Sequence, residues 1–496
     1  MLNLPILSIS ILLPLLSALY IVFFISNSRS EKKQLYAMYV AILASSLTLI
    51  ATTYLLFSFR FKIAGFQFVE RYSWVDSIGL EFHVGVDAMS VYFIFLSALL
   101  TLICIIASLF TIKKHIKEFL LCFLLLESFC IGAFSAINLL LFYGFFEVIL
   151  IPMYLIIGIW GGKDRVAAAF KFFLYTFFGS VFLLIALIYI YSQTGTFSMV
   201  ELANLAPEFS LEVQQWLWLA TFISFAVKVP MVPFHTWLPD AHVQAPTAGS
   251  VMLAGILLKL GGYAFLRVSL PMFPGASEYF AVYVLGISGF AVIYASFVAL
   301  AQTDMKKMIA YSSIAHMGYV TGAIFSFTVK GISGAVFQMI SHGLISSALF
   351  LIVGMLYERH HTKEIAKYGG VAASMPVLAT FFMIAMLGSV GLPGFSGFVG
   401  EFLSILSIFE VNPIVGIMCA FGVIIGAVYM LKLYKCVMFG EVVDKNIINF
   451  TDLKLYEKAA LVPLICLIIY IGLAPNGVLK ALAVPSANLA QLYGAL

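Results

Sequence analysis

The stretch Ser224–Arg267, SFAVKVPMVPFHTWLPDAHVQAPTAGSVMLAGILLKLGGYAFLR, places two lysines in apolar, helix-like sequence on either side of a proline-rich break. Lys228 ends an apolar run and is followed by Pro230 and Pro233, which cannot donate the amide hydrogen bonds that continue a helix. Lys259 lies near the middle of the next apolar run. A charged ammonium at membrane depth costs at least about 2.5–3.5 kcal/mol. The stretch therefore predicts a broken membrane-spanning helix beside a water-lined polar path.

Composition indicates an integral membrane protein. Of 496 residues, 63% are hydrophobic and 10% are charged, and the mean hydropathy is +1.08. Apolar runs of about 20 residues, enough to cross about 30 Å of hydrocarbon as a helix, recur from end to end without a charge-rich soluble domain between them. The first run, Leu2–Ile25, lacks a basic start and a small-residue cleavage site, so we expect a retained span. The net charge of +4 implies no nucleic-acid partner.

The fold class that these runs predict is an all-α polytopic membrane protein with about fourteen transmembrane helices. Alternate assignment of the loops puts eighteen of the 27 lysines and arginines on one side and six on the other, with three inside runs. By the positive-inside rule the richer side faces the cytoplasm, so both termini are expected outside. The helices are expected near 4–26, 35–58, 88–111, 118–136, 138–160, 166–191, 213–231, 246–269, 279–301, 307–327, 331–357, 376–408, 413–439 and 458–475.

A second broken run, GSVGLPGFSGFVGEFLSILSIF at 388–409, repeats the theme of the first and carries Glu401 directly after its glycines. The broken runs are the seventh and the twelfth, five apart, which predicts two inverted five-helix repeats whose broken helices frame an ion path. The expected regions are an N-terminal three-helix region with an outer loop (1–117), the first repeat (118–270), the second repeat (271–440), and a C-terminal helix and tail (441–496).

Carboxylates and lysines inside the runs are the first candidates for chemistry. Glu147 lies in NLLLFYGFFEVILIPMYLIIGIWGG, and a carboxylate at that depth is either neutral or paired, so Lys228 is its expected partner. The alternative for Glu147 is a protonated, hydrogen-bonded core residue. For Glu127, a protonated, hydrogen-bonded core residue and a functional carboxylate are expected equally. Lys171 lies about one turn inside its helix, and we expect it to extend to the inner interface.

Two histidines inside runs are the second set of candidates. His316 lies in AYSSIAHMGYV and His342 in FQMISHGLISSALF, and both have Ser and Gly neighbours that permit water or close helix approach. A neutral imidazole can accept and donate a proton, and its unperturbed pKa is near neutrality. A proton relay from Lys259 through these two histidines is therefore expected, with a satisfied structural histidine as the alternative for each.

Redox centres are not expected on this chain. The six cysteines form no CxxC or CxxxxC cluster, so an iron–sulfur or zinc site is not predicted, and we expect buried apolar cysteines. There is no glycine-rich strand-to-helix loop for a nucleotide. The outer loop Phe59–Asp87 is expected to hold a short hairpin, with His83 as a surface histidine.

Four segments of the chain resemble the proton-translocating, antiporter-like membrane subunits of respiratory complex I. These segments are FFEVILIPMYLIIGIWGG, AVKVPMVPFHTWLPDAHVQAPTAGSVMLAGILLKLGGY, AYSSIAHMGY and GLPGFSGFVGEFL, and the likeness covers nearly the whole chain. The resemblance implies a proton path. In this path Glu147 and Lys228 would be the interacting pair and Lys259 the central relay. His316 and His342 would be the connectors, and Glu401 the terminal residue toward the outer side.

The resemblance also implies a function. A subunit of this kind pumps protons from the cytoplasm to the periplasm, driven by electron transfer from NADH to quinone on other subunits, which bind FMN and iron–sulfur clusters. Its partners would be antiporter-like L-type and N-type neighbours and membrane lipid. Its location would be the bacterial inner membrane, or the mitochondrial inner membrane if the chain is organelle-encoded.

The alternatives to this function come from other classes. They are a subunit of a multisubunit sodium/proton antiporter, the membrane arm of an energy-converting hydrogenase, and a scaffold that pumps nothing. Glu401 separates relatives within the family, because L-type and N-type subunits and the multisubunit antiporters are expected to have lysine on that broken helix.

Overall fold

The computed structural model describes residues 4–25, 31–75, 79–109 and 111–494. Within these residues, eleven helices are long and apolar enough to cross a membrane, and three further crossings are made by α15 and by two broken helices, which gives fourteen as predicted. The crossings are α1 (Ile6–Phe24), α2 (Glu31–Ser58), α3 (Ser90–Ser108), α4 (Ile116–Ser135), α5 with α6 (Leu139–Val148, Leu150–Trp160), α7 (Arg165–Thr194), α9 with α10 (Leu211–Lys228, Trp237–Gln244), α11 to α13 (Thr247–Met272), α14 (Pro274–Leu300), α15 (Met305–Ile324), α16 (Val329–His360), α18 with α19 (Pro376–Val390, Ser396–Val411), α20 (Pro413–Met438) and α21 (Leu455–Leu473).

The two predicted breaks are present. Helix α9 ends at Lys228, and α10 begins only at Trp237, because the prolines between them interrupt the amide ladder. Helix α18 ends at Val390, and the next residue, Gly391, has a φ of +76°, a left-handed conformation that suits glycine. Since the seventh and twelfth crossings run in opposite directions, the broken helices are arranged as inverted elements.

A third interruption was not predicted. Helices α5 and α6 are separated at Ile149. Pro152 has no amide to donate to the carbonyl of Val148, so the ladder fails there. As a consequence Glu147 lies in the last turn of α5 rather than in the middle of a straight helix.

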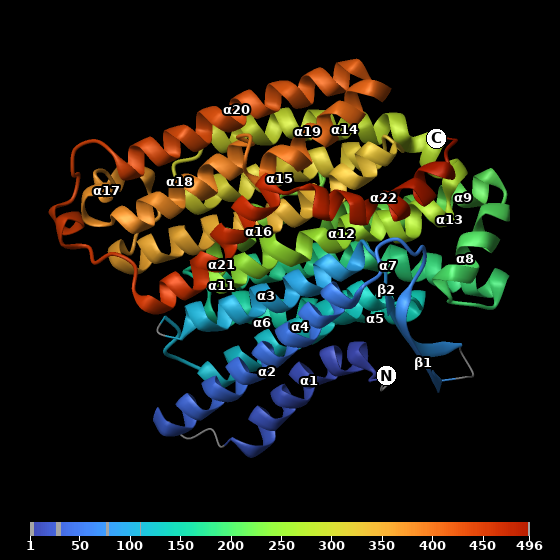
Figure 1. Cartoon of the computed structure of the whole chain (residues 1–496), viewed down its shortest axis with the longest axis horizontal. Coiled ribbons are helices and arrows are strands. Elements are labelled where there is room, and N and C mark those ends of the chain that lie inside the picture. Colours follow the sequence, from blue (N-terminus) through green and yellow to red (C-terminus); the bar gives the residue numbers. More distant parts are fainter. Residues whose placement is uncertain (1–3, 26–30, 76–78, 110, 495–496) are drawn as a thin grey trace.

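The centre of the bundle is formed by α16 and by the segment α11 to α13 (Figure 1). The most apolar part of α16 is wholly buried, and that of α11 to α13 is 94% buried, whereas α1, α2, α7, α14 and α20 present much of their surface outward. These peripheral helices form the apolar outer surface of the bundle. Polar side chains on α16 and α11 to α13 are thus enclosed by protein at the middle of the membrane.

The predicted outer hairpin consists of β1 (Gln67–Val75) and β2 (Leu80–Val86), paired antiparallel. The prediction for His83 was wrong: its side chain is buried, because β2 also pairs with the link between α4 and α5. The amide of Ile137 donates to the carbonyl of His83 at 2.9 Å, which places that link over the strand.

The C-terminal tail differs from expectation because it folds as a helix, α22 (Asn476–Gln491). It lies against α16 and α13 on the hairpin side of the bundle (Figure 1). The Ser333 and Ser486 hydroxyls are 2.9 Å apart, and the Tyr493 hydroxyl donates to the carbonyl of Leu270 at 2.8 Å. The remaining short helices are α8 (Met199–Leu205) and α17 (Val371–Ser374).

The prediction of buried cysteines holds for four and is wrong for two. Cys436 on α20 and Cys466 on α21 are exposed on the outside of the bundle. In a membrane protein an apolar run can face lipid, so apolar neighbours in sequence do not imply burial. The buried cysteines are Cys104, Cys122, Cys130 and Cys419.

Candidate functional site

Lys259 is completely buried in α12 (Leu258–Ala264). The turn before it, Leu253–Leu257, is a π-helix, in which each amide reaches one residue further back than in an α-helix. Within this π-helical turn, the carbonyl oxygen of Ala254 accepts a hydrogen bond from the Lys259 ammonium. The ammonium also lies 2.7 Å from Nδ1 of His342 on α16.

Beyond Lys259, His342 is followed across the bundle by two further ionisable side chains, His316 and Glu401. The His342 ring lies 5.4 Å, centroid to centroid, from the ring of His316 on α15. His316 Nδ1 is 2.8 Å from Glu401 Oε1 on α19, close enough for an ion pair but not in the alignment of a hydrogen bond. The amide of Gln338 donates to the same carboxylate oxygen at 3.2 Å. The structure therefore brings four of the six predicted residues together, in the order Lys259, His342, His316, Glu401.

The line borders a small polar cavity. Its volume open to the centre of a water-sized sphere is ≈ 10 Å³, about what one water molecule needs. The polar residues that line the cavity are His316, His342, Gln338, Glu401 and Ser312. Such a cavity can hold a hydrogen-bonded bridge between the two imidazoles, which do not contact each other directly.

Glycines set the close approach of the helices that carry this line. A Cβ atom on Gly343 would lie 3.0 Å from the carbonyl oxygen of Gly255 and 2.7 Å from Leu96 Cδ2. A Cβ on Gly400 would collide with Gln338. Each glycine is adjacent in sequence to a residue of the line, His342 or Glu401, so the absence of a side chain brings that residue within reach of its partner.

Substitution of Gly343 by alanine tests this packing. The methyl group must push α16 away from the π-helical turn, and overpacking of this kind costs about 1–3 kcal/mol. We expect lower thermal stability of the solubilised assembly and lower turnover, because the 2.7 Å contact between Lys259 and His342 lengthens. Gly286→Ala is the matched control, since nothing lies within 4 Å of a Cβ at that exposed helical position. Equal behaviour of the two variants would show that the close approach is unimportant.

Glu147 and Lys228 lie close to each other but are not in ion-pair contact. The Lys228 ammonium donates to the carbonyl oxygen of Phe146 at 3.4 Å and lies 4.4 Å from the centroid of the Phe146 ring. Phe146 directly precedes Glu147, so the ammonium is one residue away from the carboxylate and within range of its electrostatic attraction. The Glu147 carboxyl meets the Ser180 hydroxyl of α7, and its Oε1 atom has no partner among the described residues.

Lys228 and Lys259 lie on helices that pack tightly against each other. A Cβ atom on Gly261 would lie 2.9 Å from the carbonyl oxygen of Phe225 and from the amide of Val229. The end of α9 therefore rests against the backbone of α12. The pair Glu147 and Lys228 is thus connected to Lys259 by helix contact, without a polar contact between the two ammonium groups in the described part of the chain.

Sequence reasoning missed His242 on α10. Its ring is completely buried, stacks on Phe350 at 4.5 Å and has no hydrogen-bond partner for either nitrogen among the described residues. It lies within electrostatic range of both Lys306 and Lys259. The signal was available, because His242 lies in Ser224–Arg267, between Lys228 and Lys259. Gln338 was also missed, although Gln338, His342 and Ser346 follow a spacing of four on one helix.

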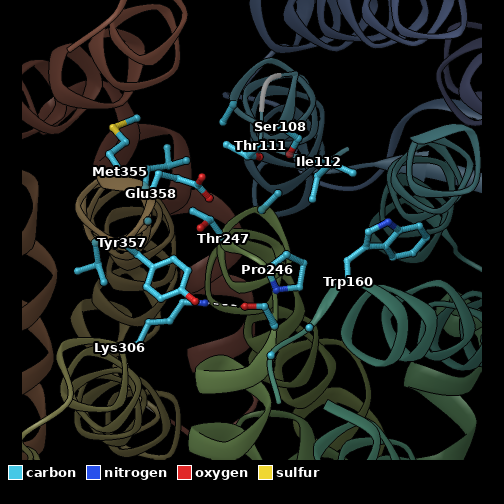
Figure 2. A pocket seen from close by; sticks show the side chains of 18 of the residues that line it. Ser108, Thr111, Ile112, Trp160, Pro246, Thr247, Lys306, Met355, Tyr357 and Glu358 are labelled. Atoms are coloured by element: carbon cyan, nitrogen blue, oxygen red, sulfur yellow. Dashed lines mark hydrogen bonds between the residues drawn. The ribbon is translucent and has the colours of Figure 1, made fainter. Parts of the chain in front are cut away.

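A larger cavity opens at the lysine-rich end of the bundle, where α3, α11, α16 and α21 meet (Figure 2). Its volume open to water-sized spheres is ≈ 220 Å³, and its polar walls include Lys306, Thr247, Glu358 and Glu457. The Lys306 ammonium donates to the carbonyl of Ala245 at 2.6 Å, at the end of α10. Lys363, in the loop after α16, caps the same helix end by donating to Val243, and burial lowers the pKa of its ammonium.

The other charged residues of the apolar runs behave differently from one another. Lys171 reaches the edge of the bundle, where its ammonium pairs with Asp240 at 2.6 Å. Glu127 is completely buried, and neither of its carboxyl oxygens has a hydrogen-bond partner in the described residues. The expectation of a hydrogen-bonded core carboxyl at Glu127 is therefore not met.

A lipid-embedded bundle with ionisable side chains in contact across its middle defines a class of protein, the membrane ion translocators. Charged and imidazole groups are costly at this depth and mark ion paths or proton relays when they face the bundle interior. Many transporters place their substrate and ion sites on broken helices of this kind.

Comparison with known proteins identifies the family. Residues 136–426 match the family described as NADH:quinone oxidoreductase/Mrp antiporter, TM. The chain is 66% identical over 489 residues to NADH-quinone oxidoreductase subunit M of Rickettsia bellii (strain RML369-C), covering 99% of each chain. It is 46% identical over 482 residues to NADH-ubiquinone oxidoreductase chain 4 of Marchantia polymorpha, covering 97% of this chain and 96% of the relative.

A solved structure agrees with these relatives. A chain of respiratory complex I from Thermus thermophilus with bound NADH superposes with a TM-score of 0.89 at 28% identity, covering 99% of this chain and 100% of that chain. The chain therefore belongs to the antiporter-like, proton-translocating membrane subunits of respiratory complex I, in the branch of NADH-quinone oxidoreductase subunit M.

Proposed function

We propose that this chain moves protons through its own interior, from Lys259 along His342 and His316 to Glu401. The observation that carries the proposal is the order of these four groups across the bundle, with 2.7 Å from Lys259 to His342 and 2.8 Å from His316 to Glu401. The two histidine rings, 5.4 Å apart, border the small cavity that separates them. All four side chains are buried, so they exchange protons with one another rather than with bulk water.

In each transfer, the donor side chain loses one proton and the next side chain gains it. The Lys259 ammonium gives a proton to Nδ1 of His342, which requires the tautomer with that nitrogen unprotonated. The imidazolium then releases the proton at Nε2, through a water in the small cavity, to His316. From His316 Nδ1 the proton passes to Oε1 of Glu401, which lies in the half of its crossing that leads outward.

The proposed control is the charge state of Glu147 and Lys228. Moving one proton against about 150 mV costs roughly 3.5 kcal/mol, which corresponds to a factor of about 300 in a protonation equilibrium. A nearby opposite charge in a buried site changes a pKa by about 1–3. Closing the pair requires only that the Lys228 ammonium move from the carbonyl of Phe146 to the adjacent carboxylate. The resulting stabilisation of the charged form of Lys228 has the magnitude that pumping demands, and Lys228 would act in turn on Lys259.

The proposed uptake route begins at the cavity on the lysine-rich side, which the positive-inside rule assigns to the cytoplasm. Lys306 lies in the wall of that cavity, and His242 lies within electrostatic range of both Lys306 and Lys259. An imidazole between two ammonium groups can hand a proton from one to the other. A proton would enter at the cavity and reach Lys259 by way of His242 once water links these groups, because neither ring nitrogen of His242 has a hydrogen-bond partner among the described residues.

The energy for this cycle comes from outside the chain. NADH oxidation and quinone reduction would take place on partner subunits that bind FMN and iron–sulfur clusters. Within the membrane, the neighbours of the chain would be antiporter-like subunits of the L and N types. The membrane would be the bacterial inner membrane, or the mitochondrial inner membrane for an organelle-encoded chain.

Substitution of the two histidines tests the route. We expect His316→Ala and His342→Ala each to reduce NADH-driven proton pumping in proteoliposomes only partly, because water can bridge one missing imidazole in a wet cavity. The double substitution removes both connectors and is expected to cut pumping by roughly 10²-fold, the lower end of general acid–base contributions. His115→Ala, at an exposed histidine outside the crossings, is the control. If the double variant pumped as the wild type does, both histidines would be structural.

A further inference from the structure

The outer end of the Lys259 helix carries a buried polar cluster that the proton line does not use. Arg267 forms an ion pair with Asp87, which lies directly after β2. The same guanidinium donates to the Tyr263 hydroxyl at 3.1 Å and lies 5.0 Å from the ring of Phe66. We refer to Phe66, Asp87, Tyr263 and Arg267 as the outer plug.

The hairpin side of the bundle holds this cluster in place. Asp87 is 6% exposed, and its Oδ1 atom accepts hydrogen bonds from the amides of Met89 and Ser90 at the start of α3. The Tyr263 ring packs edge-on against Phe93 and Phe134. The residues that flank the hairpin thus supply the counter-ion, Asp87, and an aromatic cover, Phe66, for an arginine on the central helix.

The hydrogen bonds of the outer plug lead to a dead end for protons. Arg267 donates to the Tyr263 oxygen, and the Tyr263 hydroxyl donates in turn to the carbonyl oxygen of Phe134 at 3.0 Å. A peptide carbonyl cannot pass a proton on, and a guanidinium stays protonated at any physiological pH, so it cannot relay one. Asp87 is the single proton acceptor of the cluster, and its charge is committed to Arg267.

Resting on the proposed function, in which Lys259 is a relay, we propose that Arg267 seals the outer end of this helix against proton passage between Lys259 and the outer side. Arg267 is eight residues beyond Lys259, about 12 Å along the axis. A fixed guanidinium in a narrow path excludes protons and cations. The seal would leave Glu401, on the second broken helix, as the outward terminus of the line.

The test measures passive proton flux with no NADH present. The whole complex is reconstituted into liposomes containing a pH-sensitive dye, and a potassium diffusion potential drives protons through it. Arg267→Gln removes the cation and frees the Asp87 carboxylate to accept protons. We expect the flux to rise up to about tenfold, the factor given by the loss of one repelling charge at about 12 Å with an effective dielectric of about 20.

Two further variants keep the result specific. Arg71→Gln breaks an exposed arginine–carboxylate pair within the hairpin, with Glu81 at 2.8 Å, and is expected to leave the passive flux unchanged. Arg267→Lys keeps the charge but loses the forked geometry, and a flux between those of the wild type and Arg267→Gln is expected. If Arg267→Gln fails to assemble, Arg267→Met, which removes the charge and keeps an apolar stem, takes its place, and wild-type flux in that variant overturns the seal.

A double substitution separates failure of the seal from failure of the proposed function. If the leak passes Lys259, then Arg267→Gln with Lys259→Ala must leak less than Arg267→Gln alone. Equal leaks would overturn the seal as a barrier between Lys259 and the outer side. Normal NADH-driven pumping by Lys259→Ala alone would instead overturn the proposed function, whatever the passive flux.

Discussion

Lys259→Ala is expected to reduce NADH:quinone reductase activity and the proton pumping coupled to it to less than about a hundredth of the wild-type rates, since groups that transfer protons contribute about 10²–10⁴-fold. Lys259 contacts its own helix and α16 at once, through Ala254 and His342. An alanine leaves the imidazole of His342 without a proton donor.

Assembly and electron transfer upstream of the membrane are the controls for this prediction. Reduction of ferricyanide by NADH, which bypasses the membrane arm, is expected to stay at the wild-type rate in the purified complex. Lys432→Ala is the matched variant, because Lys432 is a lysine on a crossing helix that faces outward. Wild-type pumping by Lys259→Ala, or equal losses in Lys432→Ala, would contradict the relay.

Glu147→Gln is expected to reduce coupled activity about tenfold or more, because the amide keeps the shape of the carboxyl but removes the charge that moves the lysine's pKa by about 1–3. Lys228→Ala should have an effect of the same size. The two groups are proposed to act as one switch, so the double variant should be no worse than either single one, which is the non-additivity expected of coupled residues.

The matched control is Glu212→Gln, an exposed glutamate in the first turn of α9. It lies on the same helix as Lys228 but at the opposite end, and its activity should remain unchanged. Additive losses in the double variant of Glu147 and Lys228 would mean that the two residues work independently. The absence of an ion pair between them in the structure would then be their permanent arrangement.

Much of the fold follows from local sequence. The prolines after Lys228 and the glycines before Glu401 remove hydrogen bonds or permit positive φ in any context, so both broken helices were predictable. Hydropathy alone places the crossings. It does not reveal which face of a crossing meets lipid, which is why Cys436 and Cys466 were wrongly expected to be buried.

The site was predictable in its members but not in its contacts. Lys259 and His342 are 83 residues apart, and their meeting depends on the glycine at 343 and the π-helical turn before Lys259, features that act only once the helices are packed. His83 became buried for a similar reason, because its strand pairs with a distant link. His242 was missed because a histidine near a helix end reads as interfacial until its burial is known.

The most direct test of the account is the infrared difference spectrum of the reconstituted complex with and without NADH turnover, compared between the wild type and Glu401→Gln. If protons leave the line through Glu401, turnover should change the band of a protonated carboxyl group in the wild type, that change should be missing in Glu401→Gln, and pumping should be lost with it. Identical difference spectra, with unchanged pumping in Glu401→Gln, would contradict the claim that protons travel along this line.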